Sequence, residues 1–363
     1  MTDGSRPQSP DATANQTDGV RLERTGALGR IVLDRPKALN ALTESMCRAV
    51  EAQLAAWAED ERIAAVLITA AGERAFCAGG DVVRVAKSAA ARTDDDWWRF
   101  FHAEYRMNHA IAQFPKPFIA WLDGITMGGG FGISVHGRYR IATPKTLFAM
   151  PETALGLIPD VGSGRVLPRM PGKLGLFLGL TGYRCGPADS LYCGYATHHL
   201  PSAALPALIE ALAAGAGDPD TILAAHASDP GPAPLADHRP AIDRLFNRTS
   251  VVEILAALDA DGSDWARDQA AHLRTMSPLA LAVTFEHQRR GAGLETLAEV
   301  LAMEFRVACN MVAGEHDFRE GVRALLIDKD KNPRWRPDRL DAVTPEQVAA
   351  VFGPAAPGDL SLD

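Results

Sequence analysis

The sequence lacks the features that mark several specialised classes of protein. It contains no run of about 20 apolar residues, so we expect no membrane-spanning helix and no membrane partner. Positive charge is not in excess, because 37 Lys and Arg residues face 45 Asp and Glu residues and leave a formal net charge of −8. Surfaces that bind nucleic acid are usually basic, so this balance argues against such a partner. Residues 1–19 lack the apolar centre of a signal peptide and the basic character of a transit peptide, and we expect a disordered tail there.

Cysteine is also scarce, and its pattern excludes two common uses. The five cysteines contain no Cys-x-x-Cys pair and no metal-type spacing. Their odd number in a long chain favours a reducing intracellular setting, from which we expect a cytoplasmic location. Cys77 lies in a glycine cluster, but no histidine partner is evident, so a buried structural cysteine is the better interpretation than a nucleophile. The histidines show no spacing typical of a helical metal-ligand pair, and we expect no metal site.

What the sequence does contain is typical of a large soluble globular protein. Of its 363 residues, 47% are hydrophobic and 23% are charged. Short apolar strands alternate with helical patterns up to about residue 200, which indicates α/β architecture. The expected strands are 29–34, 64–69, 118–122, 140–142 and 146–148, and the expected helices are one after an N-cap at Thr43, one over 95–112 and one opening near Gly129.

Beyond residue 200 the composition changes to one dominated by Ala and Leu, and strand signals fade. The expected helices there are 249–258, 264–274, 278–290 and 294–312, with a short helix from Pro345. The stretch from Ser228 to Pro240 is rich in Pro and Asp, and we expect a linker or an irregular loop. The sequence thus predicts a core over 20–200, a helical C-terminal region over 201–353 and a frayed tail over 354–363.

The most informative segment, 149–164, holds the carboxylates Glu152 and Asp160 among apolar residues and glycines. Burial of an ionised carboxylate is costly, so such surroundings raise its pKa and suit it to proton transfer. Two glycine clusters, at 77–81 and 127–132, precede this segment at strand-to-helix junctions. Glycine lets backbone N–H groups approach a ligand, and two converging N–H groups would form an oxyanion hole. From local sequence alone, the carboxylates could also be helix-terminal or turn residues, and the glycines could serve close packing.

Together, the separated motifs resemble the crotonase (enoyl-CoA hydratase/isomerase) superfamily, and more narrowly its 3-hydroxyisobutyryl-CoA hydrolase branch. The superfamily resemblance rests on motifs over 34–42, 75–81, 124–130 and 151–152. The branch resemblance rests on further segments over 134–137, 148–153, 159–162, 167–169, 180–182, 196–198, 304–309, 317–324, 327–331 and 333–335. The stretch over about 205–245 is much less recognisable.

The resemblance implies a spiral of ββα units followed by a helical region, and an acyl-CoA thioester as the substrate. It implies that the backbone N–H groups of Ala78 and Gly129 bind the thioester oxygen. It also implies that Glu152 and Asp160 are catalytic and that Glu104 contacts the substrate, although a solvated glutamate is the alternative at position 104. The residues implied to lie near coenzyme A are Lys37, Ala38, Leu39, Gly79, Gly80 and Asp81. Coenzyme A would be part of the substrate, with no separate cofactor, and we expect a small homo-oligomer.

One departure from the hydratase pattern favours a particular activity. Hydratases carry a carboxylate two residues after the Gly-Gly-Gly run and pair it with the glutamate that matches Glu152, whereas this chain has Gly132 there. Asp160 instead supplies a carboxylate where hydratases usually have glycine. The resemblance therefore implies hydrolysis of a short β-hydroxyacyl-CoA thioester, most closely 3-hydroxyisobutyryl-CoA in valine breakdown, with Glu152 as general base or nucleophile. Two alternatives stay open: an enoyl-CoA hydratase or isomerase, and a non-catalytic or RNA-binding protein on the same scaffold.

Overall fold

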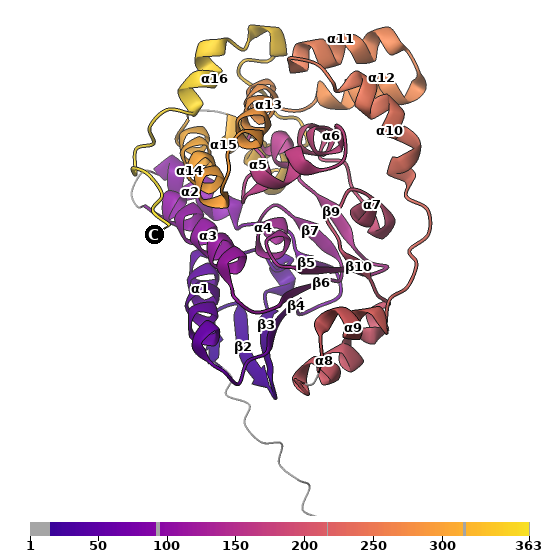
Figure 1. Ribbon diagram of the computed structural model, residues 1–363. Coiled ribbons are helices and arrows are strands. Elements are labelled where there is room, and N and C mark those ends of the chain that lie inside the picture. The colour runs from indigo at the N-terminus through magenta and orange to yellow at the C-terminus, as the bar shows by residue number, and fades with distance from the viewer. Residues whose placement is uncertain (1–14, 92–94, 216, 315–316, 363) are drawn as a thin grey trace, which may run out of the picture.

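The computed structural model describes residues 15–91, 95–215, 217–314 and 317–362 (Figure 1). The strands are β1 (Asn15–Thr17), β2 (Val20–Thr25), β3 (Leu28–Leu33), β4 (Ala65–Ala70), β5 (Ala75–Cys77), β6 (Phe118–Leu122), β7 (Ile125–Met127), β8 (Tyr139–Ala142), β9 (Leu147–Ala149) and β10 (His198–His199). The α-helices up to residue 224 are α1 (Glu44–Glu59), α2 (Val82–Ala91), α3 (Asp96–Gln113), α4 (Gly129–Val135), α5 (Ser163–Val166), α6 (Leu174–Thr181), α7 (Pro187–Tyr192), α8 (Leu205–Ala213) and α9 (Pro219–Ala224). The later helices are α10 (Pro234–Leu245), α11 (Val251–Asp261), α12 (Asp264–Leu273), α13 (Pro278–Ala292), α14 (Leu297–Ala313), α15 (Asp317–Val322) and α16 (Pro345–Val351). Each strand and helix expected from the sequence has a counterpart in the structure, whereas β1, β2, β5, β7, β10, α2, α5–α10 and α15 were not expected.

The larger sheet has seven strands in the order β1-β2-β3-β4-β6-β8-β10. The first three strands pair antiparallel, and every pair from β3 onward is parallel. Strand β1 falls within the tail expected over 1–19, so residues 15–17 differ from that expectation because they pair with β2. Residues 1–14 of the expected tail lie outside the described part of the chain.

Both faces of this sheet are buried, and each face borders a different core. On β4, Val66 and Ile68 contact the main core, whereas Ala65 and Leu67 contact a smaller core on the opposite face. This alternation follows from the period of two along a strand. Helices α1 and α3 lie on the side of the main core, and α8 and α9 cover the smaller core (Figure 1).

A second, three-stranded sheet in the order β5-β7-β9 is the feature that positions the candidate site. Its strands are parallel, with Ile125 opposite Ala75 and Leu147. Their carboxyl ends lie at the same edge of the sheet, which is where open α/β sheets generally bind ligands. The chain leaves that edge three times, into the glycine clusters and into the segment that begins at Met150.

Two helices show how local sequence builds the walls of the core. Helix α1 begins where expected, because the Thr43 side chain accepts a hydrogen bond from the backbone N–H of Met46. Helix α3 buries Phe101, Glu104, Tyr105 and Asn108, which are positions i, i+3, i+4 and i+7 of one helical face. That spacing carries three polar side chains into the protein interior.

The expected linker at 228–240 is wrong over its second half, where α10 begins. Proline at the first helical position has no N–H to leave unpaired, so Pro234 starts this helix rather than breaking it. Pro240 lies inside the helix and costs a backbone hydrogen bond. Buried Ile242 and Leu245 supply tertiary packing that offsets this cost.

The frayed tail expected over 354–363 is also wrong, for the residues up to 362 that the structure describes. Leu360 is 7% exposed, and Arg306 donates from Nε to Asp359 over 2.6 Å. Arg106 on α3 donates to the carbonyl oxygen of Ser361 over 3.2 Å. The end of the chain therefore docks beside α3 (Figure 1), because it carries an apolar side chain and polar groups that find partners there.

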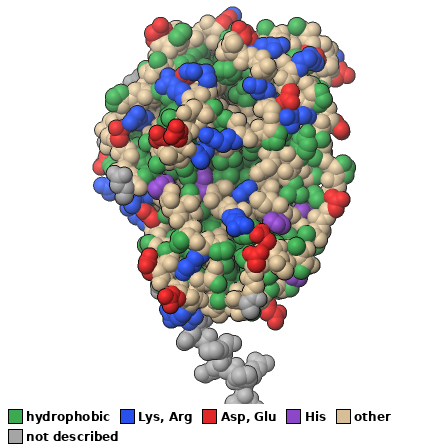
Figure 2. All heavy atoms as spheres, in the orientation of Figure 1, with side chains coloured by type: hydrophobic (Ala, Val, Ile, Leu, Met, Phe, Trp, Pro, Cys, Tyr) green, Lys and Arg blue, Asp and Glu red, His purple; other side chains and the backbone are tan. Residues whose placement is uncertain are grey.

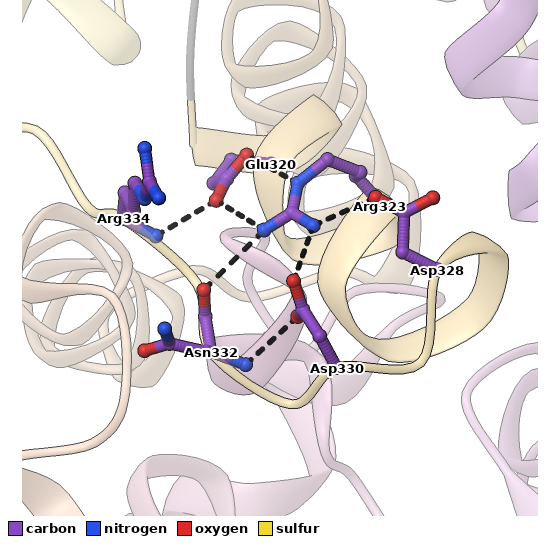
Figure 3. Close-up of polar contacts among 6 residues, drawn as sticks. All are labelled: Glu320, Arg323, Asp328, Asp330, Asn332 and Arg334. Atoms are coloured by element: carbon purple, nitrogen blue, oxygen red, sulfur yellow. Dashed lines mark hydrogen bonds and ion pairs between the residues drawn. The ribbon is translucent and has the colours of Figure 1, made fainter.

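One arginine organises the segment between α15 and α16 (Figure 3). Arg323 donates two hydrogen bonds to Glu320, at 2.9 and 2.8 Å, a bidentate geometry that fixes the guanidinium plane. It also binds Asp328 at 2.8 Å and Asp330 at 2.7 Å. This surface cluster holds the segment over 328–334 against the end of α15.

The surface agrees with the balanced composition. Figure 2 shows acidic and basic side chains interspersed over the visible face, with no large area of one sign. Within the described residues, no helix combines the length and apolarity needed to cross a membrane.

Candidate active site

Residues from three strand ends and one helix meet at the carboxyl edge of the small sheet. A Cβ atom on Gly128 would lie 2.9 Å from Oε1 of Glu152, so the second glycine cluster borders this carboxylate. A Cβ atom on Gly129 would overlap Oε1 of Glu104, which reaches the same place from α3. It would also lie 3.2 Å from the backbone nitrogen of Gly80, in the first cluster. The topology thus brings together the two glycine turns and the two glutamates that the sequence analysis singled out.

The structure differs from the sequence expectation for one of the two oxyanion-hole donors. The backbone N–H of Ala78 donates to the carbonyl oxygen of Leu39 over 3.0 Å and is therefore already used. The backbone N–H groups of Gly80 and Gly129, by contrast, donate to no backbone carbonyl oxygen of the described residues. Gly79, which separates Ala78 from Gly80, has a φ of +116°, a conformation that glycine adopts without a steric cost. The geometry therefore pairs Gly80, rather than Ala78, with Gly129.

Glu104 is buried on the inner face of α3, with 2% of its surface exposed. Its Oε1 atom has no hydrogen-bond partner within the described part of the chain. Burial, and then the charges of Asp160 and Glu152, raise the pKa of this carboxyl group well above its ordinary value. The alternative of a solvated glutamate at this position is therefore excluded.

Glu152 opens a short 3-10 turn, Glu152–Leu155, and is 5% exposed. Its Oε2 atom is another buried oxygen without a partner in the described structure. Burial raises its pKa well above the ordinary value, and the charge of Asp160 adds to the shift. A buried carboxyl group with a raised pKa in this position is a candidate for proton transfer.

Asp160 is 5% exposed, and its Oδ2 atom accepts a hydrogen bond of 2.5 Å from the hydroxyl group of Tyr105. Burial raises its pKa, the Tyr105 hydrogen bond lowers it, and the charge of Glu304 raises it, with a result of about 7. Acid–base catalysis is most efficient when the pKa lies near the working pH. Sequence reasoning missed Tyr105, although its place beside Glu104 on the buried face of α3 was a usable signal.

The turn after Asp160 has an unusual backbone. Val161 has a φ of +53°, a conformation that is costly for a β-branched residue and persists only where the surroundings hold it. Its carbonyl oxygen lies 2.8 Å from Nε2 of His136. Burial lowers the pKa of His136 to about 4, so the ring is neutral and its Nε2–H donates to this carbonyl. Sequence analysis assigned His136 no role.

A carboxylate from the helical region holds the next residues of the same turn. Glu304 on α14 accepts hydrogen bonds from the backbone N–H of Gly162 at 2.6 Å and of Gly164 at 2.9 Å. Nε2 of His287 on α13 lies 2.9 Å from Oε1 of Glu304 and donates to it, since a carboxylate only accepts. Both side chains are fully buried. Sequence analysis used Glu304 as part of a motif but did not find this contact, because its partners lie 142 and 140 residues away.

Gly132 leaves no room for the carboxylate that a hydratase would place there. A Cβ atom on Gly132 would lie 2.6 Å from Cβ of Val161 and 3.0 Å from Nδ2 of Asn108. Asn108 is fully buried on α3, and neither atom of its amide has a hydrogen-bond partner within the described residues. A buried amide without partners is costly, so this side chain is a further candidate for contact with substrate or water.

The residues implied to lie near coenzyme A include a turn that contacts the first glycine cluster. Lys37 and Ala38 are exposed on a 3-10 turn, Pro36–Ala38, and the following residue, Leu39, accepts the N–H of Ala78. The carboxylate of Asp81 lies 3.2 Å from the guanidinium group of Arg35, and this ion pair links the first glycine cluster to the turn. Asp81 also borders a cavity of about 510 Å³ along α2.

Cys77 is buried, as the sequence analysis expected. Burial raises the pKa of its thiol to about 12, so little thiolate is available at neutral pH. This property excludes Cys77 as a ready nucleophile.

Comparison with known proteins identifies similar sequences over nearly the whole chain. The sequence matches the model of the enoyl-CoA hydratase/isomerase family over residues 28–352. It is 44% identical to a mitochondrial 3-hydroxyisobutyryl-CoA hydrolase of Xenopus tropicalis, 45% to that of Danio rerio and 43% to that of Homo sapiens, each over 352 residues. These alignments cover 94% of this chain and 90–91% of the relatives.

Two solved structures are similar in both sequence and fold. A carnitinyl-CoA dehydratase from Mycobacterium thermoresistibile is 42% identical, with a TM-score of 0.90 over 96% of this chain and 99% of that one. An enoyl-CoA hydratase from Rhodobacter sphaeroides 2.4.1 is also 42% identical, with a TM-score of 0.87 over 94% of this chain and 99% of that one. The expected crotonase-type α/β fold is therefore confirmed.

The same comparison corrects the expected location. The hydrolases that the chain resembles are named as mitochondrial proteins, which contradicts the expectation of a cytoplasmic enzyme. The physical reason is that free cysteines argue against an oxidising compartment but do not distinguish one reducing compartment from another.

Proposed function

Because the chain belongs to the enoyl-CoA hydratase/isomerase family, we propose that it hydrolyses 3-hydroxyisobutyryl-CoA to 3-hydroxyisobutyrate and coenzyme A. It is an acyl-CoA thioester hydrolase by its likeness to the curated hydrolases. Similarity alone does not carry the proposal, since the hydratase and dehydratase structures are nearly as similar in sequence. The observation that carries it is the pair Glu152 and Asp160, together with a Gly132 that has no space for a hydratase carboxylate.

The proposed mechanism begins with polarisation of the thioester. The carbonyl oxygen accepts hydrogen bonds from the N–H groups of Gly80 and Gly129, which stabilise the negative charge that develops when the carbonyl carbon is attacked. Removal of one such donor typically costs about 2.7–4 kcal/mol of transition-state stabilisation. Glu104 lies next to Gly129, and we assign it the substrate hydroxyl group, which its protonated or ionised carboxyl group can bind.

The second stage of the mechanism breaks the C–S bond and delivers water. In one route Glu152 removes a proton from water, whose oxygen bonds to the acyl carbon. In the other Glu152 attacks directly, forms an anhydride, and water then cleaves it. In both routes Asp160 orients the water and passes a proton to the departing thiolate, for which a pKa of about 7 is well placed.

A hydrolysis assay with matched substrates tests the proposed function. We expect rapid thiol release from 3-hydroxyisobutyryl-CoA, no hydration of crotonyl-CoA, and a loss of at least about 10³-fold in kcat for Glu152→Gln. Hydration of crotonyl-CoA without thiol release would refute the hydrolase and revive the hydratase. A single turnover in H₂¹⁸O tests the anhydride route, because label enters the side chain of Glu152 only when water attacks the Glu152 carbonyl carbon of an anhydride.

Two accompanying proposals need separate measurements. We propose that coenzyme A enters as part of the substrate and that no other cofactor is required, which predicts unchanged thiol release after dialysis against EDTA. The expected small homo-oligomer stays a prediction, and light scattering of the purified protein would test it.

A further inference from the structure

The carboxylate of Glu304 differs from those of Glu104 and Glu152, because it accepts hydrogen bonds from the turn that follows Asp160 and from His287. It accepts two backbone N–H groups of the turn that follows Asp160 and one N–H group of His287. Two of these partners are backbone groups, and the third, the His287 side chain, is fully buried, as is Glu304 itself. A buried carboxylate that is fully hydrogen-bonded holds its partners far more rigidly than an exposed ion pair does.

We propose that Glu304, oriented by His287, is a positioning residue for the hydrolysis: it clamps the turn after Asp160 and so fixes the direction in which Asp160 presents its carboxyl group. This inference rests on the role of Asp160 in the proposed function. Glu304 acts through the backbone of Gly162 and Gly164 and does not itself touch the reacting atoms.

The backbone of the turn explains why such a clamp is needed. Val161, directly after Asp160, has a left-handed φ of +53°, which costs of order 1–3 kcal/mol unless the surroundings impose it. His136 holds the carbonyl oxygen of Val161, and Glu304 holds the next N–H along the chain. The costly peptide is therefore fixed at both ends, from α4 on one side and from α14 on the other.

The turn after Asp160 is packed closely against the side chains of Glu304 and His287. A Cβ atom on Gly164 would lie 2.6 Å from Nε2 of His287 and 3.2 Å from Oε1 of Glu304. The turn thus approaches the two side chains as closely as only glycine permits. A small change in the reach of Glu304 must move the turn, and a displacement of about 1 Å in a catalytic group can cost about 10²-fold in rate.

The same carboxylate acts on the proton equilibrium of Asp160. The titratable groups that face Asp160 or its turn are Glu104 and Tyr105 on α3, Glu152 on its 3-10 turn, His136 at the end of α4, His287 on α13 and Glu304 on α14. The negative charge of Glu304 raises the pKa of Asp160. Removal of that charge must therefore lower the pKa of Asp160, whether catalysis needs its protonated or its ionised form.

The test compares two substitutions that separate charge from reach, with thiol release followed from pH 5 to pH 9. Glu304→Gln keeps the length but removes the charge and places an amide N–H₂ group where acceptors are needed. We expect kcat to fall about 10- to 100-fold with little change in KM, and the pH midpoint that reports Asp160 to move down by about 0.5–1 unit. Glu304→Asp keeps the charge but is too short to reach both N–H groups, so we expect a similar loss in kcat without the downward shift.

A matched control distinguishes positioning from general stability. Asp189 on α7 is also buried and accepts a backbone N–H, that of Leu235, at 2.8 Å, but it has no contact with the Asp160 turn. Asp189→Asn is expected to lower the melting temperature and leave kcat and the pH midpoint unchanged. If both Glu304 variants keep kcat within twofold of the original and an unshifted midpoint, the positioning role is refuted. If the unmodified protein releases no thiol, the proposed function fails instead, so the two failures are distinguishable.

Discussion

The two buried glutamates of the core, Glu104 and Glu152, differ in their hydrogen bonding from the buried carboxylates of the helical region, Glu304 and Asp317. Among the residues that the structure describes, Glu104 and Glu152 in the core each have one buried oxygen without a hydrogen-bond partner. In the helical region, Glu304 accepts three hydrogen bonds, and Asp317 accepts one from Ser277 at 2.6 Å and one from the backbone of Arg336 at 2.9 Å. Glu104 and Glu152 thus each keep an oxygen that can accept a further hydrogen bond, while Glu304 and Asp317 are held by the hydrogen bonds that they already accept.

This difference indicates what the helical region contributes to catalysis. Unpaired buried carboxyl groups have raised pKa values and can exchange protons, but they destabilise the fold that carries them. Satisfied buried carboxylates cannot exchange protons readily, but they fix backbone geometry. A reacting centre built on three strand ends and a turn therefore gains its rigidity from helices that lie more than a hundred residues further along the chain.

The largest effect expected from this comparison is on stability, in the helical region. Glu304→Ala would leave two backbone N–H groups and the Nε2–H of His287 buried without acceptors. Breaking such a buried network typically costs about 3–5 kcal/mol, which urea unfolding would measure. The control is Glu286→Ala on α13, a carboxylate that pairs with surface arginines and should change the free energy of unfolding by less than about 1 kcal/mol. Equal losses for the two variants would contradict the comparison.

A smaller loss is expected when a glutamate is added beside Glu104 and Glu152, at position 132. Gly132→Glu restores the hydratase pattern in sequence, but its Cβ meets Cβ of Val161 at 2.6 Å. Overpacking of this kind costs about 1–3 kcal/mol, and we expect no hydration of crotonyl-CoA because the carboxylate cannot reach the site. Measurable hydratase activity in this variant would show that the absence of a side chain at 132, rather than the packing around it, determines the reaction.

These two cases also show what the sequence alone could and could not predict. The cap at Thr43 and the helix over 95–112 are local patterns that residue spacing predicts, whereas the meaning of Gly132 comes from the resemblance to hydratases. The choice of Gly80 over Ala78 depends on which backbone N–H group is already hydrogen-bonded, and local pattern does not contain that contact. The contact of Glu304 with Gly162 spans 142 residues, so only the packing of α14 on the core reveals it.

A gain in stability is expected where a reacting acid is made neutral. The pKa of Asp160 is about 7 in the folded protein, against an ordinary value of 3.8. Between these two pH values the folded state holds a proton that the unfolded state has lost, so this group's contribution to stability falls as the pH rises from about 4 through 7. Asp160→Asn removes this dependence and should be about 0.5–2 kcal/mol more stable than the original protein at pH 8, with the difference shrinking toward pH 4.

Melting curves at several pH values measure this gain. The predicted signature is a difference between the two proteins that grows with pH, together with lost thiol release. A difference that is constant from pH 5 to pH 8 would mean that the substitution acts through packing, and a stabilised variant with full activity would remove Asp160 from the mechanism.

The smallest effect compares two buried asparagines within the core itself. The amide of Asn108 has no hydrogen-bond partner in the described part of the chain. Asn40, by contrast, accepts the N–H of Arg35 and donates to the carbonyl oxygens of Ala71 and Ala75, all at 2.9 Å. Asn108→Leu replaces an unpaired amide by an apolar group of similar size, so we expect a gain of about 0.5–1 kcal/mol together with a fall in kcat/KM. Asn40→Leu breaks three bonds and leaves buried backbone groups unpaired, so it should lose about 1–3 kcal/mol. If Asn108→Leu instead destabilises the protein as much as Asn40→Leu does, the Asn108 amide is hydrogen-bonded to water and stabilises the fold. Glu104 and Glu152 would then be the candidates for substrate contact, without Asn108.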